Sequence, residues 1–362
     1  MSGPSAAVPI LDGPTSVADF EALARERMRA EEFEILASFA PGNETLRRTP
    51  LAFDALALRT RALPGAAAPD LSVTVLGHRL DIPFMLAPAG FHTRAHPDGE
   101  LATARSAARA GTVMALATNS GHPMADVARA SDGPKWFQTY VYRDRAHTFD
   151  LASQAEALGF VGLCVTIDGH WPTKRQLATK GSRRGGTADD GSRLPLRVLA
   201  DPAATWSDPS ATWADIERLK QHTALPVICK GVMTAEDALL CVASGADALV
   251  VSNHGARLGS TLASIEVLPE VIAAVDGRIE VYLDGGIRRG ADVVRALALG
   301  ARAVLLGRPM FWGLAYRGEH GLSDVLDLLR EEVEMAMMLC GRSTTASIDE
   351  TVITRAPPLS AS

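Results

Sequence analysis

A histidine and an arginine follow a short apolar run in the second half of the chain, and they are the first candidates for chemistry. Residues 248–252 are small or aliphatic, as expected of a strand that is buried on both faces. The chain then turns polar, and His254 and Arg257 come next. Barrels and open α/β sheets carry their active sites at the carboxyl ends of strands. We therefore expect a base and a fixed cation to face a ligand here, although a histidine after a strand can also be a capped core residue.

Two glycine-rich turns further along the chain indicate a phosphate site. The first is L-D-G-G-I-R-R-G at 283–290, and the second is L-L-G-R-P at 305–309. Glycine permits close approach of the backbone to a ligand, and Arg288 and Arg308 can add bidentate charge. Barrels often bind phosphate at the turns after their seventh and eighth strands. The alternative is that these glycines only make tight turns.

The elements that must position these residues repeat one pattern, a short apolar strand followed by a turn and an Ala-rich helix. Strands are predicted at 84–89, 112–117, 136–141, 161–167, 226–230, 248–252, 280–284 and 303–307. Helices are predicted between them at 101–110, 124–130, 149–158, 213–222, 235–243, 265–275 and 291–299. Strict alternation predicts parallel strands with right-handed crossovers, and eight such strands predict a closed (β/α)8 TIM barrel of the α/β class.

The whole chain, 1–362, is predicted to be a single domain, because a barrel uses about 250 residues as one unit. Residues 1–83 are expected to form an N-terminal helical segment and lead-in, 84–310 the barrel, and 311–362 C-terminal helices and a tail. One connection breaks the pattern. The long loop after strand 4, residues 169–211, is polar and glycine-rich, and we expect it to be a mobile cover of the active site.

The composition favours an enzyme that acts on small molecules. A net charge of -6 and the lack of any Lys/Arg run argue against a nucleic-acid partner. The four cysteines have no C-x-x-C spacing and no histidine placed to complete a zinc site, so we predict reduced thiols and no metal. No apolar run reaches the roughly 18 residues of a membrane span, and no signal peptide is recognisable. A cytoplasmic protein without membrane contact is expected.

Polar residues and glycines end almost every predicted strand, and together they form one candidate site. They are Pro88, Ala89, Gly90, Thr118, Asn119, Gln138, Tyr140, Thr166, Asp168, Lys230, Ser252, His254, Arg257, Asp284, Gly285, Gly286, Gly307 and Arg308. Lys230 could stabilise an anion on a ring system, or it could instead extend to the surface. Asp168 would lie across the barrel mouth from His254, where a carboxylate fixes the imidazole tautomer and raises its basicity.

These motifs resemble those of the FMN-dependent α-hydroxy-acid oxidases and dehydrogenases, the family of glycolate oxidase, lactate oxidase and mandelate dehydrogenase. The resemblance covers nearly the whole chain, to about Leu339. The motifs that carry it are V-S-N-H-G-A-R, L-D-G-G-I-R-R-G, A-L-G-A-R-A-V-L-L-G-R-P, W-F-Q-T-Y-V-Y and A-H-P-D-G-E. The resemblance implies FMN as cofactor, a 2-hydroxy acid as substrate, oxygen or another electron acceptor, and a homotetramer.

The resemblance also implies roles for individual positions. His254 would take a proton from the substrate as its α-carbon is oxidised, and Asp168 would support the imidazolium. Arg257 would bind the substrate carboxylate, Tyr140 would hydrogen-bond the substrate oxygens, and Arg175 in the long loop would approach the substrate. The implied cofactor contacts are Pro88, Ala89, Gly90, Gln138, Thr166, Lys230, Ser252, Asp284, Gly285, Gly286, Arg288, Gly307 and Arg308, with Lys230 beside the flavin N1 and C2 carbonyl.

Two departures from the family pattern fall on the substrate pocket, and another lies beside the implied flavin position. The family's substrate-binding tyrosine in the N-terminal segment falls on Ile35, and a common tryptophan falls on Asn119. Gly90 stands where the oxidases commonly carry alanine next to the flavin N5. One lost charge-assisted hydrogen bond is worth about 1.5 to 3 kcal/mol, or roughly ten- to hundred-fold in affinity. We therefore predict a nonstandard, larger substrate, unless Arg175, Asn119 or His170 restores the contact.

Three functions are compared. The first is an FMN-dependent oxidoreductase that oxidises the α-carbon of a 2-hydroxy acid or a related α-hydroxy or α-amino compound, with an oxidative decarboxylase or monooxygenase as variants. The second is a non-redox FMN barrel isomerase. The third is a flavin- or phosphate-binding protein without turnover. His254 together with Arg257 favours the first, and the complete set of polar residues argues against the third.

Overall fold

The computed structural model describes residues 13–37, 43–169 and 207–356, and every structural statement below refers to these residues. Arg175, His170 and nearly all of the long loop after the fourth barrel strand therefore lie outside the described residues.

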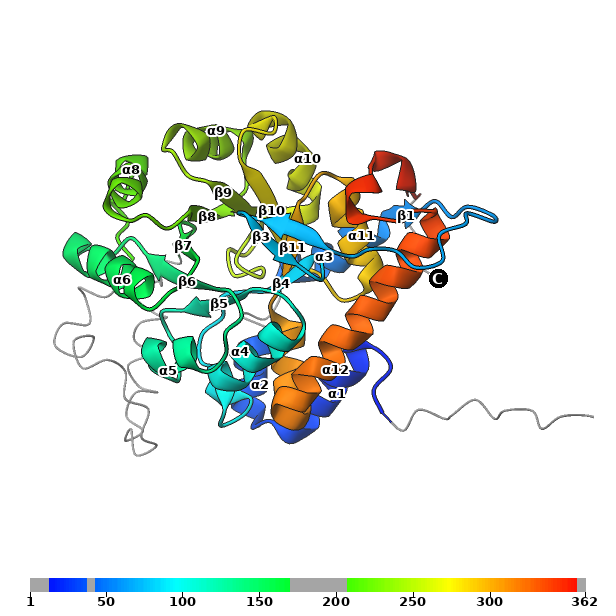
Figure 1. The fold of residues 1–362 in the computed structure, drawn as a ribbon, viewed down its shortest axis with the longest axis horizontal. Coiled ribbons are helices and arrows are strands. Elements are labelled where there is room, and N and C mark those ends of the chain that lie inside the picture. Colours follow the sequence, from blue (N-terminus) through cyan, green and yellow to red (C-terminus); the bar gives the residue numbers. More distant parts are fainter. Residues whose placement is uncertain (1–12, 38–42, 170–206, 357–362) are drawn as a thin grey trace, which may run out of the picture.

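The strands form a closed parallel barrel (Figure 1). In chain order they are β4 (Phe84–Leu86), β5 (Met114–Ala117), β6 (Lys135–Tyr140), β7 (Gly162–Thr166), β8 (Val227–Val232), β9 (Ala248–Val251), β10 (Glu280–Asp284) and β11 (Ala303–Leu306). The barrel closes where β11 pairs with β4. The predicted fold is confirmed, and the strand ends differ from the predicted ones by at most three residues. The largest difference is at β4, which ends before Pro88, a residue that has no backbone N–H to give to a ladder.

Helices surround the barrel and cover its outer face (Figure 1). They are α4 (Gly99–Arg109), α5 (Met124–Arg129), α6 (Arg145–Ala157), α8 (Trp213–His222), α9 (Ala235–Ala243), α10 (Ser264–Val275), α11 (Gly290–Ala298) and α12 (Arg308–Cys340). Several of them bury an apolar stripe. In α11, for example, Val293, Val294 and Leu297 are buried against the barrel layer. The long α12 contains a break at Arg317 and Gly318, where the backbone is not helical.

A hairpin that the sequence pattern did not predict closes one end of the barrel. It consists of β2 (Val73–Val75) and β3 (His78–Leu80), and its buried side chains pack with barrel-interior residues such as Tyr282 and Leu305. The backbone N–H of Leu76 donates to Glu280, the first residue of β10. The hairpin therefore covers the amino-terminal end of the strands, so the carboxyl ends are the open face.

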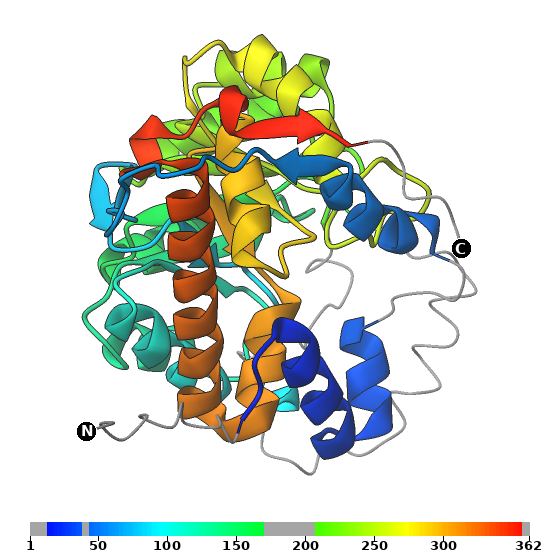
Figure 2. The same ribbon diagram turned by 90° about the vertical axis from the view of Figure 1, so that its right-hand side faces the viewer.

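The N-terminal segment contributes three helices, α1 (Val17–Arg27), α2 (Ala30–Ala37) and α3 (Glu44–Asp54), of which the last was not predicted. Ser16 caps α1, since its hydroxyl accepts the N–H of Asp19 at 3.2 Å. α1 lies along α12 (Figure 2). Phe33 of α2 stacks on Trp312 of α12 with ring centroids 4.9 Å apart. These contacts fix α2 beside the barrel.

Two segments that are far apart in the sequence also pair. β1 (Leu56–Leu58) and β12 (Ile353–Arg355) form an antiparallel pair (Figure 2). The four cysteines are free and buried, as expected. Within the described ranges, no helix is long and apolar enough to cross a membrane.

Candidate active site

A histidine and an aspartate meet at the open face of the barrel. His254 follows β9 and Asp168 follows β7, and His254 Nδ1 lies 3.0 Å from Asp168 Oδ1. The aspartate side chain is only 3% exposed, whereas the imidazole is 22% exposed. Because a carboxylate accepts the Nδ1 proton, Nε2 of the neutral ring is left as the basic atom. This geometry provides an oriented proton acceptor.

The backbone of β8 packs closely against the side chain of Asp168. Pairing of β8 with β9 shifts register between Lys230 and Val232, around Gly231. Gly231 has a φ of +117°, and a Cβ at this position would lie 2.5 Å from Cγ of Asp168. Only glycine therefore allows the strand to pass this close to the carboxylate.

Lys230, Ser252 and Asp284 form a buried polar network on three neighbouring strands or strand ends. Lys230 Nζ donates to Ser252 Oγ and lies 2.8 Å from Asp284 Oδ2, and the Ser252 hydroxyl donates to the same carboxylate at 2.8 Å. Ser252 Oγ also accepts the backbone N–H of His254 at 3.2 Å. The cation is thus held inside the barrel mouth, next to the proposed base, and does not extend to the surface.

The charges in this network keep each other ionised. Burial lowers the pKa of Lys230, but Asp284 and Asp168 outweigh it, so the pKa of this ammonium is above its ordinary value. Burial raises the pKa of Asp284, yet Lys230 and Ser252 bring that pKa below its ordinary value. A permanent positive charge therefore faces the site and can stabilise an anion that forms there.

Gln138 and Thr166 line the mouth on the neighbouring strands β6 and β7. Gln138 Nε2 donates to Thr166 Oγ1 at 2.9 Å, and Gln138 Oε1 accepts the backbone N–H of Thr118 at 3.3 Å. Both side chains are buried. Their polar atoms are oriented by these bonds, as expected of residues that contact a polar ring system.

Tyr140 and Arg257 complete the set around the base. Burial raises the pKa of Tyr140, so its hydroxyl stays a hydrogen-bond donor. Arg257 is exposed to solvent, but the surrounding protein lowers its pKa, an effect that Tyr140 opposes and Arg94 strengthens. The charges of Arg257, Asp168 and Lys230 all act on Tyr140, which places the four groups around one mouth.

Helix α3 braces the loop that carries His254 and Arg257. Thr45, on α3, accepts the N–H of Thr261 at 2.8 Å through its hydroxyl, which also contacts the carbonyl of Gly259. Asn43, at the cap of α3, donates through Nδ2 to the carbonyl of Ala256 at 2.5 Å. The unpredicted helix thus fixes the segment after β9.

The phosphate-binding motifs come together at the ends of β10 and β11. Arg308 lies in the first turn of α12 and donates to the carbonyls of Leu36 and Gly255, both at 2.9 Å. Burial, then Arg288, then Arg257 lower the pKa of Arg308 to about 10. Burial also lowers the pKa of Arg288. Two half-buried guanidiniums that repel each other are stabilised by an anion between them.

One glycine of these motifs leaves room for such an anion, and another allows close packing against α3. A Cβ at Gly307, the N-cap of α12, would meet no atom within 4 Å, so the helix N-terminus opens into free space. Gly286 has a φ of +92°, and a Cβ there would lie 2.4 Å from Phe53 of α3. Together with the polar network around Lys230, the residues present therefore fit FMN: Arg288 and Arg308 would hold its phosphate, and Lys230 would lie near its ring.

The remaining predicted residues lie toward the solvent side of the mouth. Pro88, Ala89 and Gly90 follow β4 and are half-buried, and a Cβ at Gly90 would lie 3.1 Å from the carbonyl oxygen of Asn119. Asn119 is exposed. Ile35 lies on α2 and exposes 40% of its surface.

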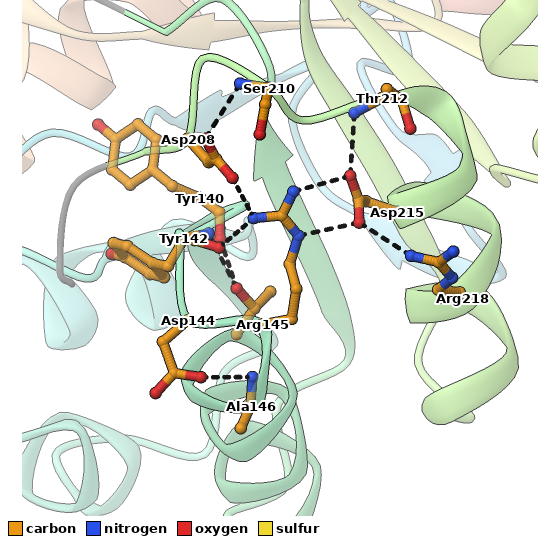
Figure 3. Close-up of polar contacts among 11 residues, drawn as sticks. Tyr140, Tyr142, Asp144, Arg145, Ala146, Asp208, Ser210, Thr212, Asp215 and Arg218 are labelled. Carbon is orange, nitrogen blue, oxygen red and sulfur yellow. Dashed lines mark hydrogen bonds and ion pairs between the residues drawn. The ribbon is translucent and has the colours of Figure 1, made fainter.

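Two charged groups near the mouth were not identified from the sequence. One is Arg145, whose guanidinium lies between Asp208 and Asp215 (Figure 3). It also donates to the carbonyl of Tyr142 at 2.6 Å, and Asp208 donates its N–H to the carbonyl of Val141 at 2.8 Å. This cluster ties the chain at residue 208 to the end of β6, the strand that carries Tyr140. The partners are 63 and 70 residues apart, so no local pattern could indicate them.

The other is Arg94, which follows β4 in the short helix η1 (His92–Arg94). Arg94 lies four residues beyond Gly90, the last residue after this strand that the sequence pattern indicated. Glu100 joins this loop to the next one, because Oε1 accepts the N–H of His92 at 2.9 Å and that of Gly121 at 3.0 Å. The segment after β4 is therefore anchored as part of the site.

Comparison with known proteins identifies the class. A model of the FMN-dependent dehydrogenase family matches residues 24–355, and the chain belongs to this family. It is similar to the peroxisomal (S)-2-hydroxy-acid oxidase of Oryza sativa subsp. japonica, at 40% identity over 92% of this chain and 94% of the relative. It is 38% identical to the L-lactate oxidase of Nostoc sp., over 94% of this chain and 98% of the relative. A crystal structure of mandelate oxidase matches with a TM-score of 0.85 and 36% identity, over 94% of this chain and 98% of that one. The predicted family and its FMN dependence are confirmed.

Proposed function

We propose that this protein oxidises the α-carbon of a 2-hydroxy acid with FMN and passes the electrons to oxygen or another acceptor. The observation that carries the proposal is the contact of His254 Nδ1 with Asp168 at 3.0 Å, beside the buried cation of Lys230. Three of its relatives are named as oxidases of 2-hydroxy acids, lactate and mandelate.

Each residue has a task in this proposal. FMN, when bound, accepts the two electrons from the substrate. Arg257 binds the substrate carboxylate, and Tyr140 donates a hydrogen bond to a substrate oxygen. His254 Nε2 takes a proton from the substrate as its α-carbon is oxidised, and the imidazolium is stabilised by Asp168 at 3.0 Å. Lys230 stabilises negative charge near the ring.

The substrate is proposed to be larger than glycolate or lactate. Ile35 is an exposed aliphatic side chain at the position where the family resemblance places a tyrosine, and Asn119 is exposed after β5. Both changes open space on the solvent side of the mouth and remove ring surface. The base and the cofactor residues are unaffected, so the chemistry is kept while the specificity differs.

The cellular location and the assembly are also proposals. Four buried, unpaired cysteines suit a reducing compartment such as the cytoplasm, although one relative is named as peroxisomal. The family resemblance suggests a homotetramer. Light scattering after size exclusion tests the assembly, and fractionation of the source cells tests the location.

The central experiment is an anaerobic panel of 2-hydroxy acids and 2-amino acids mixed with the yellow protein. Bleaching of the flavin by a hydroxy acid, followed by return of the colour and release of peroxide in air, is the expected result. A keto acid product identifies simple oxidation, whereas release of carbon dioxide identifies the decarboxylating variant. If no member of the panel bleaches the flavin, the proposed function is wrong.

A further inference from the structure

Arg94 is a charged residue at the mouth to which the proposed mechanism gives no task. Its backbone N–H donates to the carbonyl of Phe91 at 3.0 Å, and its guanidinium lies over the Phe91 ring, 5.2 Å from the centroid. Phe91 directly follows Gly90 and has a φ of +59°. The Arg94 side chain is 30% exposed. It is therefore oriented by its neighbours and is still accessible to a ligand.

The guanidinium of Arg94 is paired with a carboxylate on helix α2. Its Nη1 donates to Oε2 of Glu32, and Oε1 of Glu32 accepts from Arg29 at 2.7 Å. One carboxylate thus lies between two guanidiniums, which leaves a net positive charge. Glu32 engages Nη1 alone, and a guanidinium has five N–H donors, so Arg94 has the capacity to bind a second carboxylate.

The position of Glu32 on α2 links Arg94 to the substrate pocket. Glu32 and Ile35 are three residues apart, so they share one face of the helix. Ile35 stands where the family resemblance places a carboxylate-binding phenol. The charge of Arg94 also reaches Arg257, whose pKa it helps to lower. The two cations therefore repel each other, and an anionic ligand bound by both would relieve this repulsion.

We propose that Arg94 is a second anion-binding residue of the substrate site, and that the substrate is a 2-hydroxy acid with a further carboxylate on its side chain. Arg257 binds the carboxylate next to the reacting carbon, and Arg94 binds the distal one. A carboxylate is the fitting group, because the guanidinium already pairs with one from Glu32. This inference rests on the proposed function and names its substrate class.

The test compares 2-hydroxyglutarate with its 5-amide, which has nearly the same shape and lacks the distal charge. The rate of anaerobic flavin reduction gives kcat/KM for each. We expect the dicarboxylate to be preferred by about ten- to hundred-fold, the value of one charged hydrogen bond. Arg94→Gln should bring this ratio close to one, and the matched control Arg29→Gln should keep it. Equal rates in the unmodified enzyme, or a ratio that survives Arg94→Gln, would overturn the inference.

A second variant separates binding from a merely structural role. Glu32→Gln removes the competing carboxylate and leaves Arg94 in place, so the preference for the dicarboxylate should stay or increase. If Arg94 only anchors α2, breaking the ion pair from either side should have the same effect, and Glu32→Gln would lower the ratio as Arg94→Gln does. That result contradicts the proposal.

A binding measurement distinguishes failure of this inference from failure of the proposed function. Calorimetric titration of the yellow protein with glutarate and with its monoamide requires no turnover. We expect glutarate to bind more tightly, and Arg94→Gln to remove the difference. Bleaching by hydroxy acids without any preference for dicarboxylates refutes the inference alone. Absence of bleaching together with selective glutarate binding refutes the proposed function alone.

Discussion

The two halves of the barrel mouth are built in different ways. The half that fits the flavin is carried by β8, β9 and β10, and its polar side chains are buried and bonded to one another, as in the network of Lys230, Ser252 and Asp284. The half proposed to bind the substrate is carried by the segments after β4 and β5, by the loop after β9 and by α2. Its candidates Ile35, Asn119 and Arg257 are exposed.

This difference separates chemistry from specificity. Side chains on buried strands are held by several partners, so a substitution there disturbs the whole network. Side chains on loops and on a surface helix have fewer constraints and can change without loss of the fold. The departures at Ile35 and Asn119 lie in the second half, as this division predicts.

Substitution of His254 is expected to have the largest effect, and it tests whether this residue is the catalytic base. His254→Ala should slow flavin reduction by about 10²- to 10⁴-fold, the usual contribution of a general base, while the protein stays yellow. Asp168→Asn should act in the same direction through loss of the oriented tautomer. Rapid-mixing absorbance under anaerobic conditions measures both rates. Unchanged reduction by His254→Ala would exclude the base assignment.

A second substitution tests how far the buried half depends on pairing. Lys230→Met leaves Asp284 as a buried charge without its cation, so the free energy of unfolding should fall by about 3 to 5 kcal/mol. The control is Lys220→Met, which removes a partly exposed pair with Asp247 and should cost about 1 kcal/mol or less. Urea unfolding of the two variants gives the comparison. Similar losses of unfolding free energy in the two variants would show that the buried Lys230–Asp284 pair is no more important for stability than the Lys220–Asp247 pair.

Substitution of the exposed Arg257 tests the half of the mouth that is proposed to bind the substrate. Arg257→Lys keeps the charge but loses the bidentate fork, so the affinity for carboxylate substrates should fall about ten- to hundred-fold. Uncharged α-hydroxy compounds should be affected much less, and the unfolding midpoint should stay close to that of the unmodified protein. Equal losses for charged and uncharged compounds would remove the carboxylate role.

Low pH should decrease the free energy of unfolding through protonation of Asp284. Its pKa is lowered in the folded protein from an ordinary value of 3.8, because Lys230 and Ser252 outweigh burial. The stabilisation is therefore present above about pH 4 and is lost as the pH falls through the lower folded pKa. The difference in unfolding free energy between the unmodified protein and Asp284→Asn should shrink from pH 5 to pH 3. A constant difference would contradict the pKa shift.

Substitution of Ile35 is expected to have the smallest effect, a lower KM for small hydroxy acids. Ile35→Tyr restores a phenol to α2, and it should lower KM for small hydroxy acids by a few-fold, up to about ten-fold, the value of one modest hydrogen bond. Ile35→Phe is the matched control, since it adds the ring without the hydroxyl. If both variants behave alike, the hydroxyl is not what the pocket lacks.

The barrel could be predicted from the sequence because its signal is local. Apolar runs such as 248–252 alternate with helical patterns, and each element is recognisable on its own. The hairpin β2–β3 and the pair β1–β12 were missed for the opposite reason. Their strands have three residues each, and β1 finds its partner near the other end of the chain. Helix α3 was missed although Asn43 caps it, since a proline, Pro50, interrupts its pattern.

The amino-acid sequence was sufficient to identify the residue types at the strand ends, and with them the family and the cofactor. Which of these residues are partners depends on the folded chain. Lys230 pairs with Asp284, Arg145 lies between two aspartates of a distant segment, and Glu32 pairs with Arg94. The physical reason is that periodicity depends on neighbours along the chain, whereas charge pairing depends on distances that exist only after the barrel closes.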